Sequence, residues 1–317
     1  MHTMPIKKRN PLLVVVWSFG LFVLMHTSQY PGMFLAAKMA KVSFGGIASG
    51  AFANHYSILW MGSNAVILGI PVVFMITKYL WRRDSTWMLL DFNIRLFFDG
   101  AILGLLVPIC IVAVLSLFDV VRVTGHPTRF SSLELGSALM GFLGLSLFTG
   151  IVEEVVFRGM AAREFAARYG WIVAAMMSGL YFGVVHLLSE IPTVSIGDAL
   201  WIVLGAMIVG ALFVTMLVRS GSLWFPIGFH VAWNFCLAAI IGTRMSGDES
   251  SLGLFETELH GSPALTGGKF GLELSVISIL AYVIVTIILL RFSPSHRNSI
   301  PVPDSLLPGD GPAGHRS

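Results

Sequence analysis

Long apolar runs alternate with short polar segments along the chain, and this pattern predicts a bundle of membrane-spanning helices. Several runs reach the roughly 20 residues that a helix needs to cross the hydrocarbon core of a bilayer. Eight spans follow from the pattern, at residues 11–28, 58–80, 97–118, 133–157, 171–188, 199–218, 222–242 and 272–292. We therefore expect an all-α, polytopic integral membrane protein with about eight transmembrane helices.

The polar segments divide the chain into four parts. Residues 1–130 are expected to hold about three transmembrane helices, 131–242 a core, and 243–292 a polar loop followed by the last helix. Residues 293–317 are rich in Pro, Gly and Ser and are expected to form a disordered tail. Residues 29–57, rich in Gly, Ala and aromatic side chains, are expected to form a long loop at the membrane interface.

Composition agrees with a membrane protein. Of the 317 residues, 12% are charged and 56% are hydrophobic, whereas a soluble domain carries about 25% charged residues. The net charge of +3 does not indicate a nucleic-acid partner, because the basic residues stand at the ends of apolar runs, where membrane topology explains them. Cys110 and Cys236 fall inside expected spans and predict no disulfide framework.

The distribution of Lys and Arg predicts the orientation. With the N-terminus in the cytoplasm, 14 of the 20 basic residues lie on cytoplasmic segments and 6 on the other side. The positive-inside rule then places both termini in the cytoplasm, and we expect the plasma (inner) membrane. The first apolar run follows a basic stretch, as in a signal peptide, but the segment after it is a poor cleavage site, so we expect a retained span.

Ionisable residues interrupt the fourth apolar run in "EEVVFR", residues 153–158. Charged side chains in such surroundings are costly unless they are paired. Glu154 and Arg158 are four residues apart and lie on one helix face, so they can pair. Glu153 is rotated by about 100° from Glu154 and stays available for another partner.

Two further polar pairs stand in other spans. Phe182 and His186 are four apart in "YFGVVH", and His230 and Asn234 are four apart in "FHVAWN", so each pair shares a helix face. A single histidine or asparagine in a span is more often a packing residue that bonds a neighbouring helix. Together with Glu153, however, they supply a carboxylate, two imidazoles and a carboxamide, which are the groups that a hydrolase needs.

The depth of these residues is consistent with one site. The midpoint between Glu153 and His186 falls at "RYG", residues 168–170, where Gly170 suits a turn between antiparallel helices. Each residue then lies about 16 residues, or roughly 24 Å, from the turn. His230 follows the expected turn at 219–221. We expect all of these groups to open towards one cavity on the cytoplasmic side.

The three motifs resemble those of a known family. "EEVVFR", "FGVVH" and "HVAWN" are similar to the EExxxR, FxxxH and HxxxN motifs of the CPBP (Abi) intramembrane proteases, which include the type II CAAX prenyl endopeptidases. The resemblance covers about residues 135–240 and implies that residues 131–242 are a protease core. It implies roles for the matching positions as follows: Glu153 and His186 activate a water, His230 and Asn234 stabilise the oxyanion, Glu154 and Arg158 brace the first motif, and Phe182 packs beneath the site.

The resemblance leaves the metal question open. Glu153, His186 and His230 could ligate Zn²⁺ with one open position, or the same residues could work without metal as a glutamate-dependent protease. The chain has no HExxH motif. We favour the reading without a tightly bound catalytic metal.

Two functions follow from the same residues. The leading one is an intramembrane endopeptidase that cleaves a membrane-associated protein or peptide. Prenylated CaaX tails are the family's eukaryotic substrates, and nothing in the sequence assigns a substrate to this chain. The alternative is a non-enzymatic transporter or scaffold that uses the Glu/His/Asn set for proton relay or ligand binding. A transporter predicts paired broken helices or an internal repeat, and the sequence shows neither.

Overall fold

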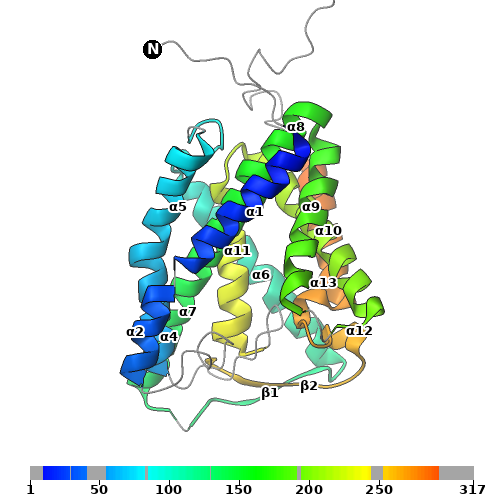
Figure 1. Cartoon of the computed structure of the whole chain (residues 1–317). Coiled ribbons are helices and arrows are strands. Elements are labelled where there is room, and N and C mark those ends of the chain that lie inside the picture. Colours follow the sequence, from blue (N-terminus) through cyan, green and yellow to red (C-terminus); the bar gives the residue numbers. More distant parts are fainter. Residues whose placement is uncertain are drawn as a thin grey trace, which may run out of the picture.

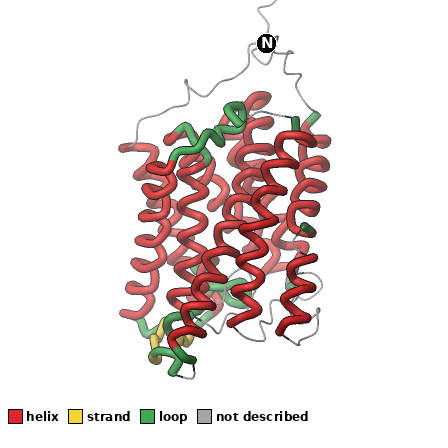
Figure 2. Tube along the Cα trace, turned by 90° about the vertical axis from the view of Figure 1, so that its left-hand side faces the viewer, coloured by secondary structure: helices red, strands yellow, loops and turns green. Residues whose placement is uncertain are grey.

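The fold is a bundle of helices with one small two-stranded ribbon at one end (Figures 1 and 2). The computed structural model describes residues 10–28, 30–40, 55–82, 85–128, 130–190, 194–243 and 253–292. The tail expected at 293–317 lies outside these residues.

Seven helices in the described ranges are long and apolar enough to cross a membrane. The elements that build them are α1 (Pro11–Thr27) with α2 (Tyr30–Ala40); α4 (His55–Asn64), η1 (Ala65–Gly69), α5 (Ile70–Ile76) and η2 (Thr77–Trp81); α6 (Ile94–Leu117); α7 (Ser132–Glu153), η3 (Glu154–Ala162) and α8 (Arg163–Tyr169); α9 (Trp171–Glu190); α10 (Ile196–Ser220); and α11 (Trp224–Phe235) with η4 (Cys236–Ile241). The shorter apolar helix α13 (Val276–Phe292) stands where the eighth span was expected. The prediction of an all-α, polytopic integral membrane protein is confirmed.

One expected loop is helical. Residues 30–40 were predicted to belong to a loop, but they form α2. Pro31 falls in the first turn of that helix, where its missing N–H costs nothing. The Met, Leu, Ala and Lys residues that follow favour helix, and the composition of the wider segment concealed this local preference.

The expected polar loop at 243–270 also contains regular structure. Strand β2 (Glu256–Leu259) pairs antiparallel with β1 (Val121–Gly125), with Val121 opposite Leu259, and the short helix α12 (Pro263–Thr266) follows. The alternating valines of β1 fit a strand. The pairing joins segments more than 130 residues apart, and such a contact is not visible in either segment alone.

The turn between the fourth and fifth spans lies where the sequence predicted it. Helical structure continues from α7 through η3 and α8 to Tyr169, and α9 begins at Trp171. Gly170 between them has φ +83°, a conformation that a residue without Cβ adopts at no steric cost. The fourth span is therefore longer than the predicted 133–157.

Polar side chains cap the N-termini of two helices, α7 and α10. At the start of α7, the Glu134 N–H donates to the Ser131 hydroxyl and the Ser131 N–H donates to the Glu134 carboxylate, which forms a capping box. Ser195 caps α10 by accepting from the N–H of Asp198. These caps satisfy backbone N–H groups that have no partner within the helix.

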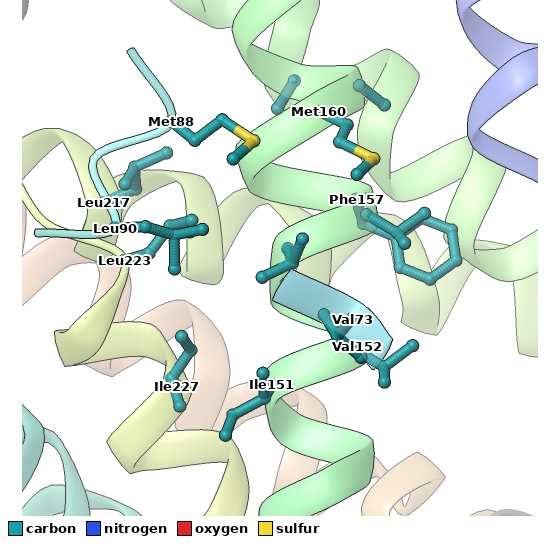
Figure 3. Packing of buried hydrophobic residues seen from close by; sticks show 14 of the residues in the cluster. Val73, Met88, Leu90, Ile151, Val152, Phe157, Met160, Leu217, Leu223 and Ile227 are labelled. Carbon is teal, nitrogen blue, oxygen red and sulfur yellow. The ribbon is translucent and has the colours of Figure 1, made fainter. Parts of the chain in front are cut away.

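The two ends of the bundle differ. Figure 1 shows α8 at one end, hereafter the α8 end, and β1, β2 and α12 at the other, hereafter the ribbon end. A buried loop, residues 87–90, fills the α8 end. The Arg163 side chain donates to the carbonyl of Trp87 at 2.9 Å, and the Trp224 indole donates to the carbonyl of Leu90 at 3.0 Å. Figure 3 shows the apolar cluster around this loop, including Met88, Leu90, Leu217 and Leu223.

Glycines bring α6 and α11 into close contact. Gly100 and Gly104 of α6 lie against the backbone of Phe225 and Phe229, and a Cβ at either glycine would collide with it. Gly228 of α11 lies equally close to the backbone of α6. Small residues at an interface let two transmembrane helices approach closely. The α6 helix thus fixes the position of α11, which carries His230 and Asn234.

Candidate active site

Three ionisable side chains from three helices meet inside the bundle. Glu153 is the last residue of α7, His186 lies on α9 and His230 on α11. The His186 Nε2 is 3.9 Å from Glu153 Oε1, and the His230 Nε2 is 3.6 Å from Glu153 Oε2. The Glu153 carboxylate therefore lies between two imidazoles.

These groups line one cavity of about 220 Å³. Asn234 and Phe182 line the same cavity, so the structure brings together all four candidate catalytic residues and one of the three candidate supporting residues, Phe182. Much of the remaining wall is aromatic and consists of Phe213, Phe229, Trp233, Phe270 and Tyr282. A mostly apolar cavity with a few convergent polar groups is typical of a binding or catalytic site.

Hydrogen bonds orient both imidazole rings in the same way. The Nδ1 of His186 donates to the carbonyl of Phe182 at 3.0 Å. The Nδ1 of His230 donates to Oε1 of Glu154, also at 3.0 Å. Because a carbonyl and a carboxylate only accept, each Nδ1 carries the proton. Both Nε2 atoms then face Glu153.

The predicted pair of Glu154 and Arg158 is present. The Arg158 Nη1 donates to Glu154 Oε1 at 3.0 Å, and both side chains are fully buried. The same carboxylate oxygen also accepts from His230. Glu154 therefore links the structural pair of the fourth span to the imidazole of the seventh, a connection that the spacing within "EEVVFR" does not reveal.

Aromatic rings hold the rest of the Arg158 guanidinium. Its Cζ lies 4.5 Å from the ring centroid of Phe213 and 4.8 Å from that of Phe182. In the described part of the chain, the Nε and Nη2 of Arg158 have no hydrogen-bond partner. Attraction between a cation and aromatic faces grows when both are desolvated. These rings therefore offset part of the cost of burying the charge.

The same two rings also contact the histidines. The ring centroid of Phe182 lies 4.2 Å from that of His186, and the ring separates this imidazole from Arg158. Phe182 was predicted to pack beneath the site, and these contacts show which two side chains it packs against. Phe213 stacks on His230 at 5.2 Å. Sequence reasoning missed Phe213 because α10 carries no polar motif at that position.

A π-helical segment carries the first motif. All nine residues of η3, Glu154–Ala162, are buried. Wider helical turns of this kind occur often at functional sites. The segment begins directly after Glu153, so Glu154 and Arg158 lie within η3 while Glu153 remains in α7.

The cavity lies towards the ribbon end of the bundle. Phe270, Glu273 and Leu274 line it, and they belong to the segment that joins β2 to α13 at the ribbon end. At the α8 end, the space is filled by the buried loop of residues 87–90. Counting residues from the Gly170 turn gave the depth of the site but could not show which end is closed.

The donor atoms include those of a zinc site. A carboxylate and two imidazoles resemble a His₂Glu ligand set, and the Nδ1 partners are of the kind that metal-bound histidines have. However, in the described ranges no three His, Cys, Asp or Glu side chains are grouped so as to hold a metal ion. The steps below therefore use water and side chains alone.

The comparison with known families agrees with this site. Residues 135–236 match the family model described as type II CAAX prenyl endopeptidase Rce1-like, and that range holds every candidate site residue from Glu153 to Asn234. The match confirms the resemblance to the CPBP (Abi) proteases. At the level of the family it supports a CAAX-type intramembrane protease acting on a membrane-associated substrate. No curated protein matches the chain.

Proposed function

We propose that this integral membrane protein is an endopeptidase in which Glu153 and His186 activate a water molecule to hydrolyse a peptide bond. One observation carries the proposal: the Glu153 carboxylate lies within 4 Å of two imidazole Nε2 atoms, in a cavity that Asn234 also lines. These groups can act on one carbonyl because a base and oxyanion donors must surround a single reacting centre.

Water activation uses the groups on the α7 and α9 sides of the cavity. A water bound between Glu153 Oε1 and His186 Nε2 can bond both, since these atoms are 3.9 Å apart. Glu153 accepts a proton from the water as its oxygen forms a bond to the peptide carbonyl carbon. Because the Nδ1 of His186 carries the proton, its Nε2 is an acceptor and can accept a hydrogen bond from the water.

The oxyanion is stabilised on the α11 side. The amide of Asn234 donates one hydrogen bond, and His230 Nε2–H donates the other. Because the Nδ1 proton of His230 is held by Glu154, Nε2 can donate only when His230 is an imidazolium. The carboxylates of Glu153 and Glu154 on either side of the ring favour that cation.

Collapse of the tetrahedral intermediate completes the reaction. The carbon–nitrogen bond breaks, and Glu153 returns the proton that it took from water to the leaving amine. The products are a new carboxylate and a new amino terminus, and no other reactant is consumed.

Cleavage of membrane-anchored peptides by purified protein tests the proposal. Glu153→Gln removes the base with little change of volume and should abolish cleavage that the wild type performs. Glu164→Gln is the matched control, because Glu164 is also a buried carboxylate on the same continuous helix and does not line the cavity. Equal cleavage by Glu153→Gln and wild type would refute the role of Glu153, whereas absence of cleavage by the wild type would favour the alternative of a transporter or scaffold.

We also propose that both termini lie in the cytoplasm. Among the described residues, the elements and loops at the α8 end carry Lys78, Arg82, Arg95, Arg163, Arg168, Arg219 and Arg291, whereas those at the ribbon end carry Lys38, Arg122 and Lys269. The positive-inside rule then makes the α8 end cytoplasmic. A reporter fused after Ser317 should be active only in the cytoplasm, and activity outside it would refute this orientation.

A further inference from the structure

Hydrogen bonds hold the segment before α13 against the catalytic cavity, which is the cavity that Glu153 lines. The Trp201 indole of α10 donates to the carbonyl of Leu274 at 2.9 Å, and the Tyr282 hydroxyl of α13 donates to the carbonyl of Glu273 at 3.1 Å. Two helices therefore fix this segment as one wall of the cavity.

A second cavity of about 540 Å³ adjoins the catalytic cavity at this wall. It lies between the start of α10 and the segment that runs from α12 to Leu274. Three residues line both cavities, namely Ile202, Phe270 and Leu274. The ring centroid of Phe270 lies 6.2 Å from that of His186. A group in the second cavity that contacts Phe270 is therefore one side chain away from the imidazole that holds the water in the proposed mechanism.

The two walls of the second cavity differ in their relation to the family match. The α10 wall, with Asp198 and Ile202, lies within residues 135–236, whereas the opposite wall, from Pro263 to Leu274, lies beyond them. Every candidate catalytic residue lies within the matched range. Residues outside the match can therefore select a substrate without any change in the groups proposed to perform the chemistry.

The lining of the second cavity fits a polypeptide better than an acyl chain. Its surface combines apolar side chains with one acidic and one basic side chain, namely Trp201, Ile202, Phe270 and Leu274 with Asp198 and Lys269. The Asp198 carboxylate accepts from the Ser195 hydroxyl at 2.8 Å, which fixes it at the start of α10. A peptide offers apolar side chains together with amide groups that bond charged side chains, whereas an acyl chain would only desolvate the charges. A cavity of this volume is large enough for a short peptide segment.

From these contacts we infer that the second cavity is a substrate subsite. It binds a large apolar side chain of the polypeptide whose scissile bond lies in the catalytic cavity, and Ile202 and Phe270 at the junction select for that side chain. The inference rests on the proposed function and names its substrate class: a membrane-associated polypeptide with a large apolar residue close to the cleaved bond. Binding energy from such a contact, away from the reacting atoms, is available to orient the peptide at Glu153.

Selectivity among related peptides tests the subsite. Purified protein is given peptides joined to an acyl chain that differ at one position near the cleaved bond, with alanine, leucine, phenylalanine or tryptophan there. At one such position we expect kcat/KM of the wild type to be about 10-fold or more higher for the large residues than for alanine, as in other apolar pockets. Ile202→Trp fills the junction of the two cavities and should remove this preference.

Two further variants complete the comparison. Leu204→Trp is the matched control, because Leu204 lies on the same helix, is 54% exposed and lines neither cavity. It should keep the wild-type preference. Ala264→Trp adds an indole to the opposite, exposed wall of the second cavity and replaces Ile202→Trp if that variant does not fold. No preference in the wild type, or the same preference in the wild type, Ile202→Trp and Ala264→Trp, would overturn the inference.

Photo-crosslinking tests occupancy of the second cavity without catalysis. The probe is a tripeptide amide, acetyl-leucyl-(p-benzoylphenylalanyl)-leucinamide, added to Glu153→Gln protein in phosphatidylcholine vesicles, and mass spectrometry locates the crosslinks. We expect crosslinks to residues that line the second cavity, lost in an added Ala264→Trp and kept in an added Leu204→Trp. Absence of crosslinks from the second cavity would overturn the inference. Labelling of this cavity by a photoreactive phosphatidylcholine that the tripeptide does not displace would overturn it as well, because the occupant would then be lipid.

The two experiments separate the subsite from the proposed chemistry. If the tripeptide crosslinks to the second cavity but the wild type cleaves no peptide, the protease fails and the peptide-binding cavity stands. If cleavage depends on Glu153 but Ile202→Trp and Ala264→Trp leave the side-chain preference unchanged, the protease stands and the subsite fails.

Discussion

The Nδ1 of His230 lies 3.0 Å from Oε1 of Glu154, the oxygen that also accepts from Arg158. This arrangement gives the second glutamate of the first motif two partners with different tasks. Arg158 neutralises its charge in the buried helix, and His230 is held by it with Nε2 towards Glu153. Glu154 is therefore a positioning residue for the proposed oxyanion site as well as a structural one.

Replacing Arg158 and Glu154 in separate variants should divide these tasks. Arg158→Met leaves a buried carboxylate without its guanidinium, and breaking a buried ion pair in this way costs about 3–5 kcal/mol. We expect a large loss of folded yield, measured by gel filtration, with the surviving protein still active. Glu154→Gln should fold better, with kcat lowered and KM little changed, because an amide supports the His230 cation less well. Normal yield of an inactive Arg158→Met would place Arg158 in the mechanism instead.

The oxyanion donors should affect turnover strongly. His230→Ala and Asn234→Ala each remove one hydrogen bond to the developing charge, and losing such a donor lowers kcat by roughly 10²–10³-fold. Single-turnover cleavage by each purified variant measures the effect. Asn234→Asp keeps the size of the side chain but cannot donate when ionised, so it should be as impaired as Asn234→Ala. If Asn234→Asp retains wild-type turnover, the oxyanion role is wrong.

The contact between α6 and α11 should be intolerant of any added side chain. Gly104→Ala pushes a methyl group into the backbone of α11, and overpacking of this kind costs about 1–3 kcal/mol. We expect a lower melting temperature in detergent together with reduced activity, since α11 carries His230. Gly136→Ala in α7 is the control, because a Cβ there meets no atom within 4 Å. Equal stability of the two variants would contradict the close approach.

Chelation separates the two ways in which Glu153, His186 and His230 could work. We expect purified wild-type protein to contain no stoichiometric zinc and to keep its activity after treatment with a chelator. Elemental analysis and a cleavage assay on the same sample make the measurement. Stoichiometric zinc, with activity lost on chelation and restored by zinc, would establish these three side chains as metal ligands.

Much of the fold was predictable because its information is local. Apolar runs of sufficient length indicate spans, and Gly170 marks the turn that brings Glu153 and His186 to similar depth. The same reasoning predicted that Glu154 and Arg158 are neighbours, because a spacing of four residues places both on one helix face. These features depend on positions within one or two neighbouring helices.

Other features depend on contacts between distant segments. Phe213 is an apolar residue among others, and only the packing of α10 against η3 and α11 places its ring on both Arg158 and His230. In the sequence, residues 87–90 stand between charged positions and give no sign of burial. The loop is buried because its carbonyl groups accept hydrogen bonds from Arg163, Leu223 and Trp224. The loop is buried at the α8 end and does not line the catalytic cavity, and neither fact is visible in the sequence of the loop itself.

The central claim is that Glu153 and His186 activate one water together, and a double-mutant cycle of cleavage rates tests it most directly. Residues that act as a unit are non-additive. Glu153→Gln and His186→Ala should each remove most of the activity, and the double variant should lose little more than either single variant. Losses in the two single variants that multiply in the double variant would show independent roles and contradict the claim.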